Sequence, residues 1–435
     1  MESAKRRKFL KTASVATAGF FIAGPVQAKE EVLSVGVIGP GGMGSNHLSL
    51  LVKRKDVRVD YVCDADKGRL EAAAKSVKAA TGVEPKAVQD MRQVYDDKNV
   101  AAVWIATPDH WHGPATILAC DAGKHVYVEK PCSHNIREGR LMVDAARRNK
   151  RIVQVGTQAR SSSHAIEAMK RIKDGAIGEV LVAKAWNSQI RRNIGKTKTS
   201  QPPASLDYDL WIGPAPMRPY QSNMLPGIWR WWLDFGTGDA GNDGVHDIDL
   251  ARWGLGVNTH PSKVAAIGGK SFFDDDQQFP DTMYCVFEYP GASKAGKSRQ
   301  LIFEQRIWSP YVQEGHENGN AFYGTQGMII LGKGAGWQMF GPKNKLIEEM
   351  KGKFDLPAHQ QNFLDCVRSG NVPNAEIAEG HLSAALAHLG NTACLIGQGF
   401  DFSPEQEKVT NLVQADVRVK RQYREGGHWA VPKGV

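Results

Sequence analysis

The sequence lacks long hydrophobic runs and internal repeats, and beyond its first 28 residues it has no block of basic residues. Its early apolar stretch, Ala13 to Ala23, is too short to cross a bilayer, which needs about 20 apolar residues. Without a zinc-finger or RNA-binding signature, nucleic acid is not an expected partner. Without repeats, a solenoid or propeller is excluded. These absences leave a large globular chain.

The first 28 residues predict an export signal. A basic run from Lys5 to Lys11 precedes the short apolar stretch, and Ala28 fits a cleavage site. The pair Arg6-Arg7 is similar to that of twin-arginine signals. The alternative is a disordered basic tail on a cytosolic protein. We expect a twin-arginine signal peptide over residues 1–28, a periplasmic or otherwise exported protein, and no stable membrane anchor after the signal is removed.

The positive charge is concentrated in this leader. Five Lys and Arg residues and one acid lie within residues 1–28, so the net charge of +9 falls to +5 in the rest of the chain. A mildly basic body does not favour nucleic acid. The 407 residues that remain of 435 exceed what one core usually holds, so we expect two domains.

Cysteines are few, and six in an exported chain raise the question of disulfides. Cys63 and Cys285 lie in strand-like runs, whereas Cys120 and Cys394 lie in helical patterns. Because twin-arginine substrates fold in the reducing cytosol before export, we expect mostly free and buried thiols.

Two patterns divide the body of the chain. Strand-like runs alternate with helical windows at residues 32–39, 57–64, 101–108, 125–131 and 151–158. This alternation predicts an α/β fold with a parallel, doubly wound sheet over residues 29–158. After Arg160 the strand-like runs lengthen and helices become few. We therefore expect a second, α+β domain over residues 159–435, with a large, mostly antiparallel open sheet and an aromatic-rich loop near 195–240.

Gly39, Gly41 and Gly44 form the spacing G-x-G-x-x-G between the first strand-like run and a helix. Such glycines let backbone N–H groups approach a pyrophosphate at the positive end of a helix. Asp64 ends the next strand, where a carboxylate binds an adenosine ribose and repels a 2′-phosphate. The context predicts a Rossmann domain that binds NAD; the alternative is a tight turn beside a surface aspartate.

Three further motifs follow in order: "TPDHWH" at 107–112, "EKP" at 129–131 and "GVHDIDLARW" at 244–253. Together they resemble the Gfo/Idh/MocA oxidoreductase family over nearly the whole body of the chain. The resemblance implies a turn at 107–112 beside the nicotinamide ribose and a carbohydrate or polyol substrate. With its leader, the chain is also similar to exported members of that family, the periplasmic glucose-fructose oxidoreductases.

The motifs define the expected cofactor site. Its residues are Gly39, Gly41, Met43, Gly44, Asp64, Thr107, Pro108, Asp109, His110, His112, Glu129, Lys130 and Gln158. The short polar turn with Asp109, His110 and His112 has a metal site as its alternative. Without a cysteine pair or an H-E-x-x-H arrangement, we expect no metal.

Lys130 and His246 are the expected catalytic residues. Lys130 ends a strand, where it can bind a sugar hydroxyl and stabilise a developing alkoxide. His246 begins a helical pattern and is suited to proton transfer near neutral pH. The family often has an aspartate four residues before this histidine, whereas this chain has Asn242, followed by Asp243, and an amide cannot act as a base. The alternatives are a surface lysine and a core histidine.

The stretch "WRWWLDF" at 229–235 places three tryptophans around Arg230. Indole faces stack on pyranose rings, and Arg230 can bind hydroxyls or an acidic group, so this is a candidate substrate wall. A role in the core or at a subunit interface is the alternative, and Trp186 leaves the same choice. The expected substrate-binding residues are Arg160, Trp186, Arg230, Asn242 and Asp243.

These observations predict an exported NAD-dependent oxidoreductase that moves hydride between a tightly held nicotinamide and a hydroxyl-bearing carbon of a sugar or glycoside. Tight retention is expected because NAD is scarce outside the cytoplasm. The resemblance also allows a redox-assisted glycosidase or lyase, which oxidises the sugar, eliminates the aglycone and reduces the ring with the same NAD. A non-catalytic sugar-binding or nucleotide-binding module is disfavoured by the presence of both Lys130 and His246. We also expect a homo-oligomer formed through the C-terminal sheet.

Overall fold

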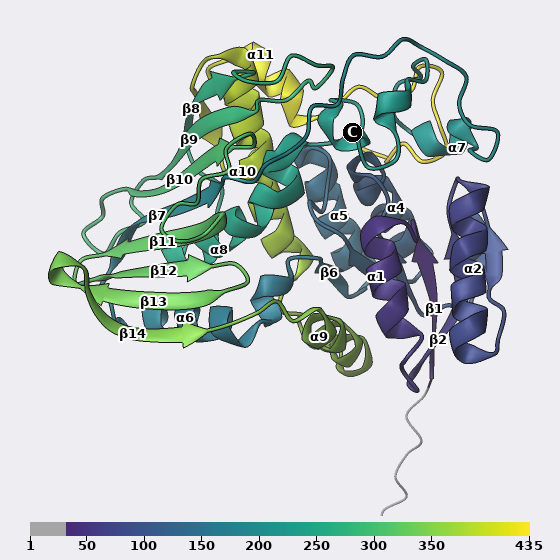
Figure 1. Cartoon of the computed structure of the whole chain (residues 1–435), viewed down its shortest axis with the longest axis horizontal. Coiled ribbons are helices and arrows are strands. Elements are labelled where there is room, and N and C mark those ends of the chain that lie inside the picture. Colours follow the sequence, from purple (N-terminus) through teal and green to yellow (C-terminus); the bar gives the residue numbers. More distant parts are fainter. Residues whose placement is uncertain (1–31) are drawn as a thin grey trace, which may run out of the picture.

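We describe residues 32–435 of a computed structural model, so the predicted export signal at residues 1–28 lies outside the described residues. A parallel sheet near the N-terminus and a larger mixed sheet lie on opposite sides of the molecule, with helices between them (Figure 1). No helix within the described range is both long and apolar enough to span a membrane.

The first sheet has six parallel strands in the order β3-β2-β1-β4-β5-β6. They are β1 (Leu33–Ile38), β2 (Val57–Cys63), β3 (Lys86–Val88), β4 (Ala102–Ile105), β5 (His125–Val128) and β6 (Val153–Val155). This is the strand order of a dinucleotide-binding sheet, in which the ligand crevice lies where the order reverses, between β1 and β4. The predicted doubly wound sheet is confirmed, and the short β3 is an addition to it.

Apolar residues of these strands enter two separate cores. Along β4, Val103 and Ile105 join one cluster, while Ala102 and Trp104 join the other. A sheet with both faces covered needs continuous apolar runs, which is what the sequence shows. The covering helices are α1 (Gly42–Leu51), α2 (Lys67–Thr81), α3 (Arg92–Asp96), α4 (Asp109–Asp121) and α5 (Ile136–Arg148).

The second sheet has ten strands in the order β14-β13-β12-β11-β7-β10-β9-β8-β15-β16. They are β7 (Val180–Asn187), β8 (Lys263–Gly269), β9 (Thr282–Tyr289), β10 (Arg299–Arg306), β11 (Asn318–Gly324), β12 (Met328–Gly332), β13 (Gly336–Gly341), β14 (Lys345–Lys351), β15 (Phe400–Ser403) and β16 (Lys408–Val409). The paired strands run antiparallel, except that β7 and β10 run parallel. The mostly antiparallel sheet is therefore confirmed.

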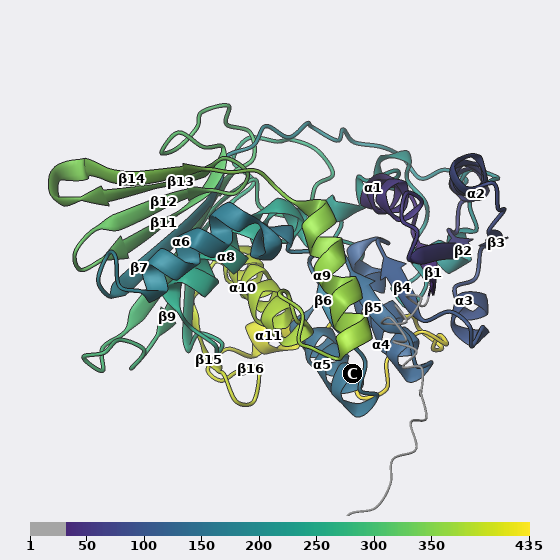
Figure 2. The ribbon, with the colours of Figure 1, turned by 90° about the horizontal axis from the view of Figure 1, so that it is seen from below.

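Helices α6 (Ser163–Lys173), α8 (Val245–Leu255) and α10 (Ile377–Ile396) lie along one face of this sheet (Figure 2). Along β9, Cys285 and Phe287 are fully buried, whereas Tyr284 and Val286 alternate with them and are exposed. This period of two marks a strand with one face toward the helices and one toward solvent.

Residues from the second half of the chain also cover the first sheet. In α9 (Leu356–Ser369), the ring of Phe363 packs edge-on against Trp104 at 5.2 Å. Near the C-terminus, Ala430 is buried in the core formed with Ile105 and Val128. The short helices α7 (Tyr208–Ile212) and α11 (Val413–Asp416) complete the α-helices of the described range. The two sheets are thus joined by packing as well as by the chain.

All six cysteines are buried and free of disulfides, including the four that were expected to be so from their place in strands and helices. Because two sizeable cores stabilise the fold, covalent cross-links are not needed at this chain length.

Candidate active site

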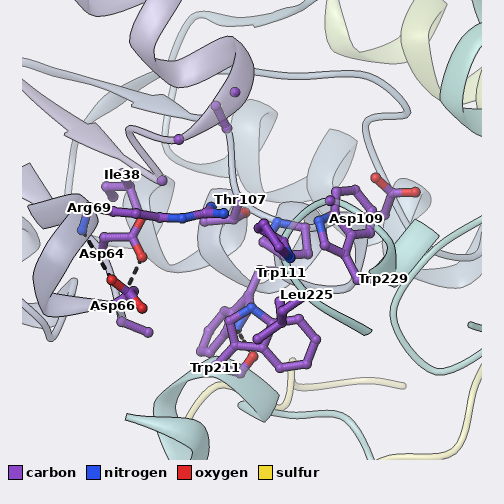
Figure 3. A pocket seen from close by; sticks show the side chains of 18 of the residues that line it. Ile38, Asp64, Asp66, Arg69, Thr107, Asp109, Trp111, Trp211, Leu225 and Trp229 are labelled. Atoms are coloured by element: carbon purple, nitrogen blue, oxygen red, sulfur yellow. Dashed lines mark hydrogen bonds between the residues drawn. The ribbon is translucent and has the colours of Figure 1, made fainter. Parts of the chain in front are cut away.

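A cavity of about 590 Å³ lies along the carboxyl ends of the first sheet. Its walls come from the glycine turn, the ends of β2, β4 and β5, and the loop that contains α7 (Figure 3). Asn242 and Trp429 complete the lining from distant parts of the sequence. The cavity therefore joins the parallel sheet to residues of the second half of the chain, which is where an open α/β sheet binds its ligand.

The glycine turn is shaped by close backbone contacts. A Cβ atom on Gly39, whose φ is +78°, would lie 2.7 Å from the carbonyl oxygen of Ala106 on the neighbouring strand. On Gly44 it would lie 2.0 Å from the carbonyl oxygen of Gly39. Helix α1 begins after Gly41, which makes no side-chain cap, so the first N–H groups of the helix are free for an anion. Gly39, Gly41 and Met43 line the cavity.

Asp64 follows β2 and lines the same cavity. One of its carboxylate oxygens accepts a hydrogen bond from the backbone N–H of Asp66 at 2.9 Å. Burial raises the pKa of Asp64 to about 6, although this hydrogen bond and the nearby Arg69 oppose the rise. A poorly hydrated carboxylate beside the glycine turn is suited to accept hydrogen bonds from ribose hydroxyls.

The turn after β4 supplies Thr107 and Pro108 to the cavity wall, and the first turn of α4 supplies Asp109 and His112. Asp109 is buried, accepts a hydrogen bond from the hydroxyl of Thr237 at 2.6 Å, and has its pKa raised by burial. The ring nitrogens of His112 lie 2.6 Å from the Pro131 carbonyl and 2.8 Å from the Thr107 carbonyl. These contacts hold the turn against the end of β5.

His110 does not line the cavity. Its ring lies 3.0 Å from the Trp211 carbonyl oxygen and packs edge-on against Phe235 at 5.1 Å between ring centroids. Burial lowers its pKa to about 3, so the imidazole is neutral at physiological pH. The structure therefore corrects the prediction that His110 binds the cofactor: it packs the aromatic loop onto α4.

Glu129 and Lys130 follow β5 and both line the cavity. Glu129 accepts hydrogen bonds from His47 at 2.9 Å and from the side chain of Gln158 at 3.2 Å. Burial opposes ionisation of Glu129, but the contact with His47 prevails and lowers its pKa to about 2. Gln158 therefore acts through Glu129, since it does not reach the cavity itself.

Lys130 brings a positive charge to the cavity at the carboxyl end of β5. Its ammonium group donates a hydrogen bond to the backbone carbonyl of Asn242 at 2.5 Å. Among residues 32–435, no carboxylate lies within 4 Å of the Lys130 ammonium group. The remaining N–H donors of Lys130 are therefore available to a ligand in the cavity.

Asn242 and His246 flank a change of helix type. Residues Ala240–Gly244 form a π-helical turn that leads directly into α8, and such turns often occur at functional sites. Asn242 lines the cavity and donates a hydrogen bond to Asp239 at 2.8 Å. His246 lies just behind the wall, only 7 % exposed. Burial and the charges of Lys333 and Lys130 lower its pKa to about 3, so it is neutral at physiological pH.

Asp243 is not among the residues that line the cavity. Its carboxylate pairs with the Lys333 ammonium group at 2.6 Å and accepts a hydrogen bond from Asn318 at 2.8 Å. Lys333 comes from the turn between β12 and β13, so this pair fixes the π-helical turn to the second sheet. In this structure Asp243 positions the segment that carries Asn242, and its predicted contact with substrate stays a prediction.

The tryptophan-rich stretch divides between cavity and core. Trp229 and Arg230 line the cavity, while Trp231 and Trp232 are 5 % and 3 % exposed and belong to two apolar clusters. Within this stretch, Trp229 and Arg230 are therefore placed for the predicted substrate wall, whereas Trp231 and Trp232 belong to the core.

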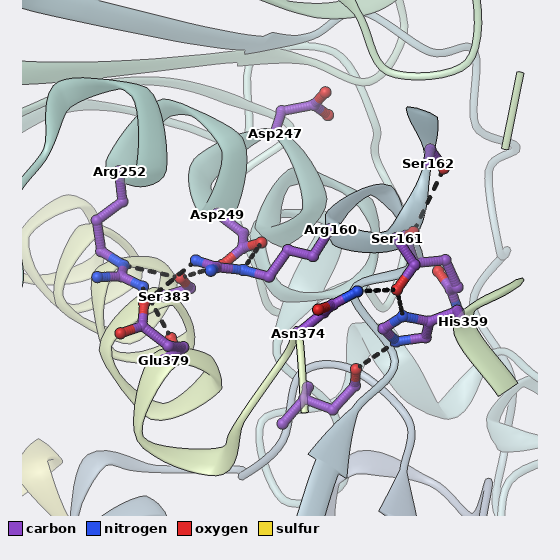
Figure 4. Close-up of polar contacts among 12 residues, drawn as sticks. Arg160, Ser161, Ser162, Asp247, Asp249, Arg252, His359, Asn374, Glu379 and Ser383 are labelled. Atoms are coloured by element: carbon purple, nitrogen blue, oxygen red, sulfur yellow. Dashed lines mark hydrogen bonds and ion pairs between the residues drawn. The ribbon is translucent and has the colours of Figure 1, made fainter. Parts of the chain in front are cut away.

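Arg160 and Trp186 lie outside the cavity. The Arg160 guanidinium pairs with Asp249 at 2.8 Å and with Glu379 at 3.3 Å in a buried network (Figure 4). The Trp186 indole is fully buried in the sheet and donates its N–H to the His316 carbonyl at 3.0 Å. The prediction that these two residues bind substrate is therefore corrected: both are structural.

Several lining residues were not foreseen from the sequence. They are Arg69, Trp111, Leu206, Leu210, Trp211, Tyr220, Leu225 and Trp429. Four of the eight are aromatic, and three of these four cluster near the motif at 107–112 or in the aromatic-rich loop. The aromatic composition of these two segments could have indicated that they line the cavity. Trp429 belongs to no local sequence motif that could have done so.

A separate cluster of His260, His381 and Glu407 has potential ligand atoms within 4.8 Å of one another. Both histidines lie 2.9 Å from the same oxygen of Glu407, and Arg140 donates to that oxygen at 2.5 Å. A guanidinium on the shared ligand atom repels a metal cation. We therefore describe this group as an ion-pair cluster that links α5 and α10 to the loop between β15 and β16.

A glycine cradle, a ribose-facing aspartate and an unpaired lysine at the carboxyl ends of one parallel sheet define an NAD-binding oxidoreductase site. The family model for the "Oxidoreductase family, NAD-binding Rossmann fold" matches residues 33–157, and that for its "C-terminal alpha/beta domain" matches residues 180–285. Together these matches cover more than half of the chain. The chain belongs to the Gfo/Idh/MocA oxidoreductase family, and its cofactor is NAD.

Known relatives include dehydrogenases and glycosyl hydrolases. Inositol 2-dehydrogenase 2 of Saccharopolyspora erythraea is 33% identical over 59% of this chain and 63% of its own length. The scyllo-inositol 2-dehydrogenase (NAD(+)) of Bacillus subtilis is 26% identical over 79% of this chain and 89% of its own length. A glycosyl hydrolase family 109 protein of Shewanella pealeana is 27% identical over 41% of this chain and 45% of its own length. The chain thus spans less than two thirds of the first and third of these relatives.

The fold is shared with solved structures. A levoglucosan dehydrogenase in complex with NADH and levoglucosan aligns with 85% of this chain and 99% of its own, with a TM-score of 0.63 and 20% identity. Similarity at this level supports the two-domain architecture.

Proposed function

We propose that this protein is an NAD-dependent oxidoreductase that transfers hydride between a nicotinamide and a hydroxyl-bearing carbon of a sugar, glycoside or polyol. The observation that carries the proposal is Lys130, which faces the same cavity as the glycine turn and lacks a carboxylate partner within the described residues. The two inositol dehydrogenases among the relatives act on a polyol and favour the same substrate class.

In this reaction, one group of residues would bind the cofactor and Lys130 would handle the hydroxyl proton of the substrate. The glycine turn and Asp64 would hold the dinucleotide, and a bound nicotinamide would supply the hydride acceptor. Oxidation of the carbinol to a carbonyl releases the hydroxyl proton. Lys130 that has lost its own proton to solvent accepts this proton as it binds the oxygen, and in the reverse direction the ammonium group donates the proton back to the carbonyl oxygen.

His246 has a narrower role than the sequence suggested. With a pKa near 3, its imidazole is a weak base at neutral pH and does not line the cavity. Its neutral ring lies close to the charges of Lys130 and Glu129. We therefore assign the first proton transfer to Lys130 and treat His246 as the neutral neighbour that orients it.

A redox-assisted glycosidase is the second candidate, since a glycosyl hydrolase family 109 protein is 27% identical over 41% of the chain. The two activities differ in the final state of the nicotinamide. A dehydrogenase leaves it reduced, whereas a redox-assisted glycosidase restores it within each cycle.

The deciding experiment mixes the NAD-loaded enzyme with a panel of aryl glycosides and follows reduced nicotinamide and aglycone together. We expect one reduced nicotinamide per enzyme with the glycosidic bond intact. Lys130→Met should retain NAD but lose about 10²- to 10⁴-fold in hydride transfer, the usual contribution of an acid-base group. Many rounds of aglycone release without an added acceptor would establish the glycosidase instead.

We further propose that the protein is exported by the twin-arginine route with NAD already bound. The support is the Arg6-Arg7 pair ahead of a short apolar stretch and the scarcity of NAD outside the cytoplasm. Cell fractionation of an Arg6→Lys, Arg7→Lys variant tests it: retention in the cytoplasm is expected, and unchanged export would contradict the proposal.

We also propose a homo-oligomer formed through the helix-free face of the second sheet. On that face Ile267 is 81 % exposed, and Tyr284, its partner across β8 and β9, is 45 % exposed. Apolar side chains gathered on an open sheet favour association. Light scattering should give a mass above that of one chain, and a monomer at micromolar concentration would contradict this.

A further inference from the structure

The guanidinium of Arg230 lines the active-site cavity without a counter-ion. Arg230 lies in a short 3₁₀ helix, Trp229–Trp231, and its charged group is 5.6 Å from the Trp229 ring. Its Nε is buried without a hydrogen-bond partner. Among the residues from 32 to 435, no carboxylate lies within 4 Å of its charged group. Arg230 is thus a largely buried cation that faces a ligand cavity unpaired.

The acids around Arg230 already have partners. Asp109 accepts the hydrogen bond from Thr237, and Asp239 is held by Arg191 at 3.0 Å and by the Asn187 amide at 2.8 Å. Burial lowers the pKa of Arg230 in spite of these acids, but a guanidinium keeps its proton in proteins. Because a buried charge is costly unless it is paired, the missing anion is expected from the ligand.

The position of Arg230 is fixed in advance. A Cβ atom on Gly236 would lie 2.3 Å from the Arg230 Cα atom, so the loop closes tightly behind this residue. Trp232 fixes the same turn through its indole N–H, which donates to the Asn223 carbonyl at 3.1 Å. A guanidinium on a fixed turn is suited to bind a planar, bidentate partner.

Arg230 lies at the Lys130 end of the cavity. The charges of Lys130 and Arg230 both act on the Asp109 carboxyl and oppose the rise of its pKa. The two cations therefore lie near the same carboxyl group. At the opposite end, Arg69 lies beside Asp64 and Gly41. The cofactor pyrophosphate belongs at the glycine turn, so Arg230 is placed for a group on the substrate.

We propose that the substrate is an acidic sugar whose carboxylate pairs with Arg230 while its reacting hydroxyl contacts Lys130. This inference rests on the proposed oxidoreductase function. A carboxylate fits better than a phosphate because one unpaired guanidinium balances a single negative charge, whereas a phosphomonoester carries about 1.5 to 2. The Trp229 ring beside Arg230 offers a flat surface for the apolar face of the pyranose.

The test uses the NAD-loaded enzyme with matched sugars. The probes are methyl glucuronoside and methyl galacturonoside, their neutral counterparts methyl glucoside and methyl galactoside, and glucose 6-phosphate. Calorimetry measures binding, and nicotinamide reduction measures kcat/KM. We expect an acidic sugar to be favoured over its neutral partner by at least about tenfold, the effect of one hydrogen bond to a charged group. A preference for the phosphate ester would assign the site to phosphoryl groups and overturn the carboxylate.

Two variants separate this role from a structural one. Arg230→Met should remove the preference for the acid while retaining NAD and the melting temperature, and its kcat/KM should fall much more on the acidic sugar than on the neutral partner. Arg230→Lys, which keeps the charge but not the planar fork, should recover only part of the preference. Equal losses on acidic and neutral sugars, or loss of bound NAD, would overturn the inference.

The outcomes also distinguish the inference from the proposed function. If sugars reduce the nicotinamide without any preference for acids, the inference fails and the oxidoreductase stands. If acids bind in an Arg230-dependent way but no sugar reduces the nicotinamide, the oxidoreductase fails and the acid site stands. If no acid binds, the inference fails whatever the activity.

Discussion

Cofactor affinity should depend on pH through Asp64. This carboxyl faces the cavity after β2, and burial raises its pKa from 3.8 to about 6 in the free enzyme. Only the ionised carboxylate accepts hydrogen bonds from both ribose hydroxyls. One pH unit below the pKa, about one Asp64 in ten is ionised, so the apparent affinity for NAD should be about tenfold weaker at about pH 5 than at about pH 7.5.

The same carboxyl affects stability in the opposite sense. Because its pKa is raised on folding, the NAD-free folded state binds a proton more tightly than the unfolded chain does. The free energy of unfolding of the NAD-free protein should therefore fall as pH rises from about 4 to about 6, and bound NAD should offset that loss. A carboxylate that is paired in the free enzyme would have a lowered pKa, and its contribution to the free energy of unfolding would instead increase as pH rises.

Fluorescence titration of NAD-stripped protein across this pH range measures the affinity. Asp64→Asn should weaken binding by about tenfold or more at about pH 7.5 and flatten the pH profile. Asp66→Asn is the matched control, because Asp66 caps α2 by accepting from the Arg69 N–H at 3.1 Å and asparagine caps equally well. An affinity that does not change with pH, or a profile that Asp64→Asn leaves intact, would refute the reasoning.

Two further predictions concern the glycine turn and the Glu407 cluster. Gly44→Ala should abolish NAD retention in native mass spectrometry, since its methyl group would lie 2.0 Å from a backbone oxygen; Ser45→Ala, on the exposed side of α1, should retain NAD. Glu407→Gln should lower the free energy of unfolding in urea by about 3 kcal/mol or more, because two buried histidines and Arg140 lose their shared carboxylate. Its contacts hold the pKa of Glu407 well below the usual range, so this difference should persist above about pH 4.5 and shrink as pH falls further. A Gln variant as stable as the parent protein would contradict the ion-pair description.

Local motifs in the sequence were enough to predict the cofactor half of the site. The glycine spacing and Asp64 depend on neighbours within one strand-turn-helix unit, and Gly39, Gly41 and Asp64 line the cavity, whereas Gly44 does not. Lys130 was predictable for the same reason, because the end of a parallel strand points into the crevice. The alternating strands and helices likewise predicted the first sheet, since each strand is buried on both faces.

Residues whose partners lie far along the chain could not be placed in this way. Arg160 was expected at the substrate, yet its charge is satisfied by Asp249 and Glu379 from two distant helices. The residues on either side of Arg160 in the sequence do not indicate that Asp249 and Glu379 are its partners. His110 and His112 are two residues apart on one helix, so they point in different directions, and only His112 reaches the cavity. Sequence spacing identifies the turn, but tertiary packing decides which side chain faces inward.

The wall contributed by Trp429 has a consequence for the order of events during synthesis. The Trp429 ring contacts Trp111 at 5.6 Å and Arg92 at 4.4 Å, so the cofactor pocket is bounded partly by residues that the ribosome adds long after the last strand of the parallel sheet. Phe363 of α9 likewise packs on the first sheet only after most of the chain has been made. A nascent chain that has completed the six parallel strands therefore still lacks a closed pocket. Stable capture of NAD then has to wait until the residues up to Trp429 have been made, and a bound dinucleotide reports that both sheets have folded.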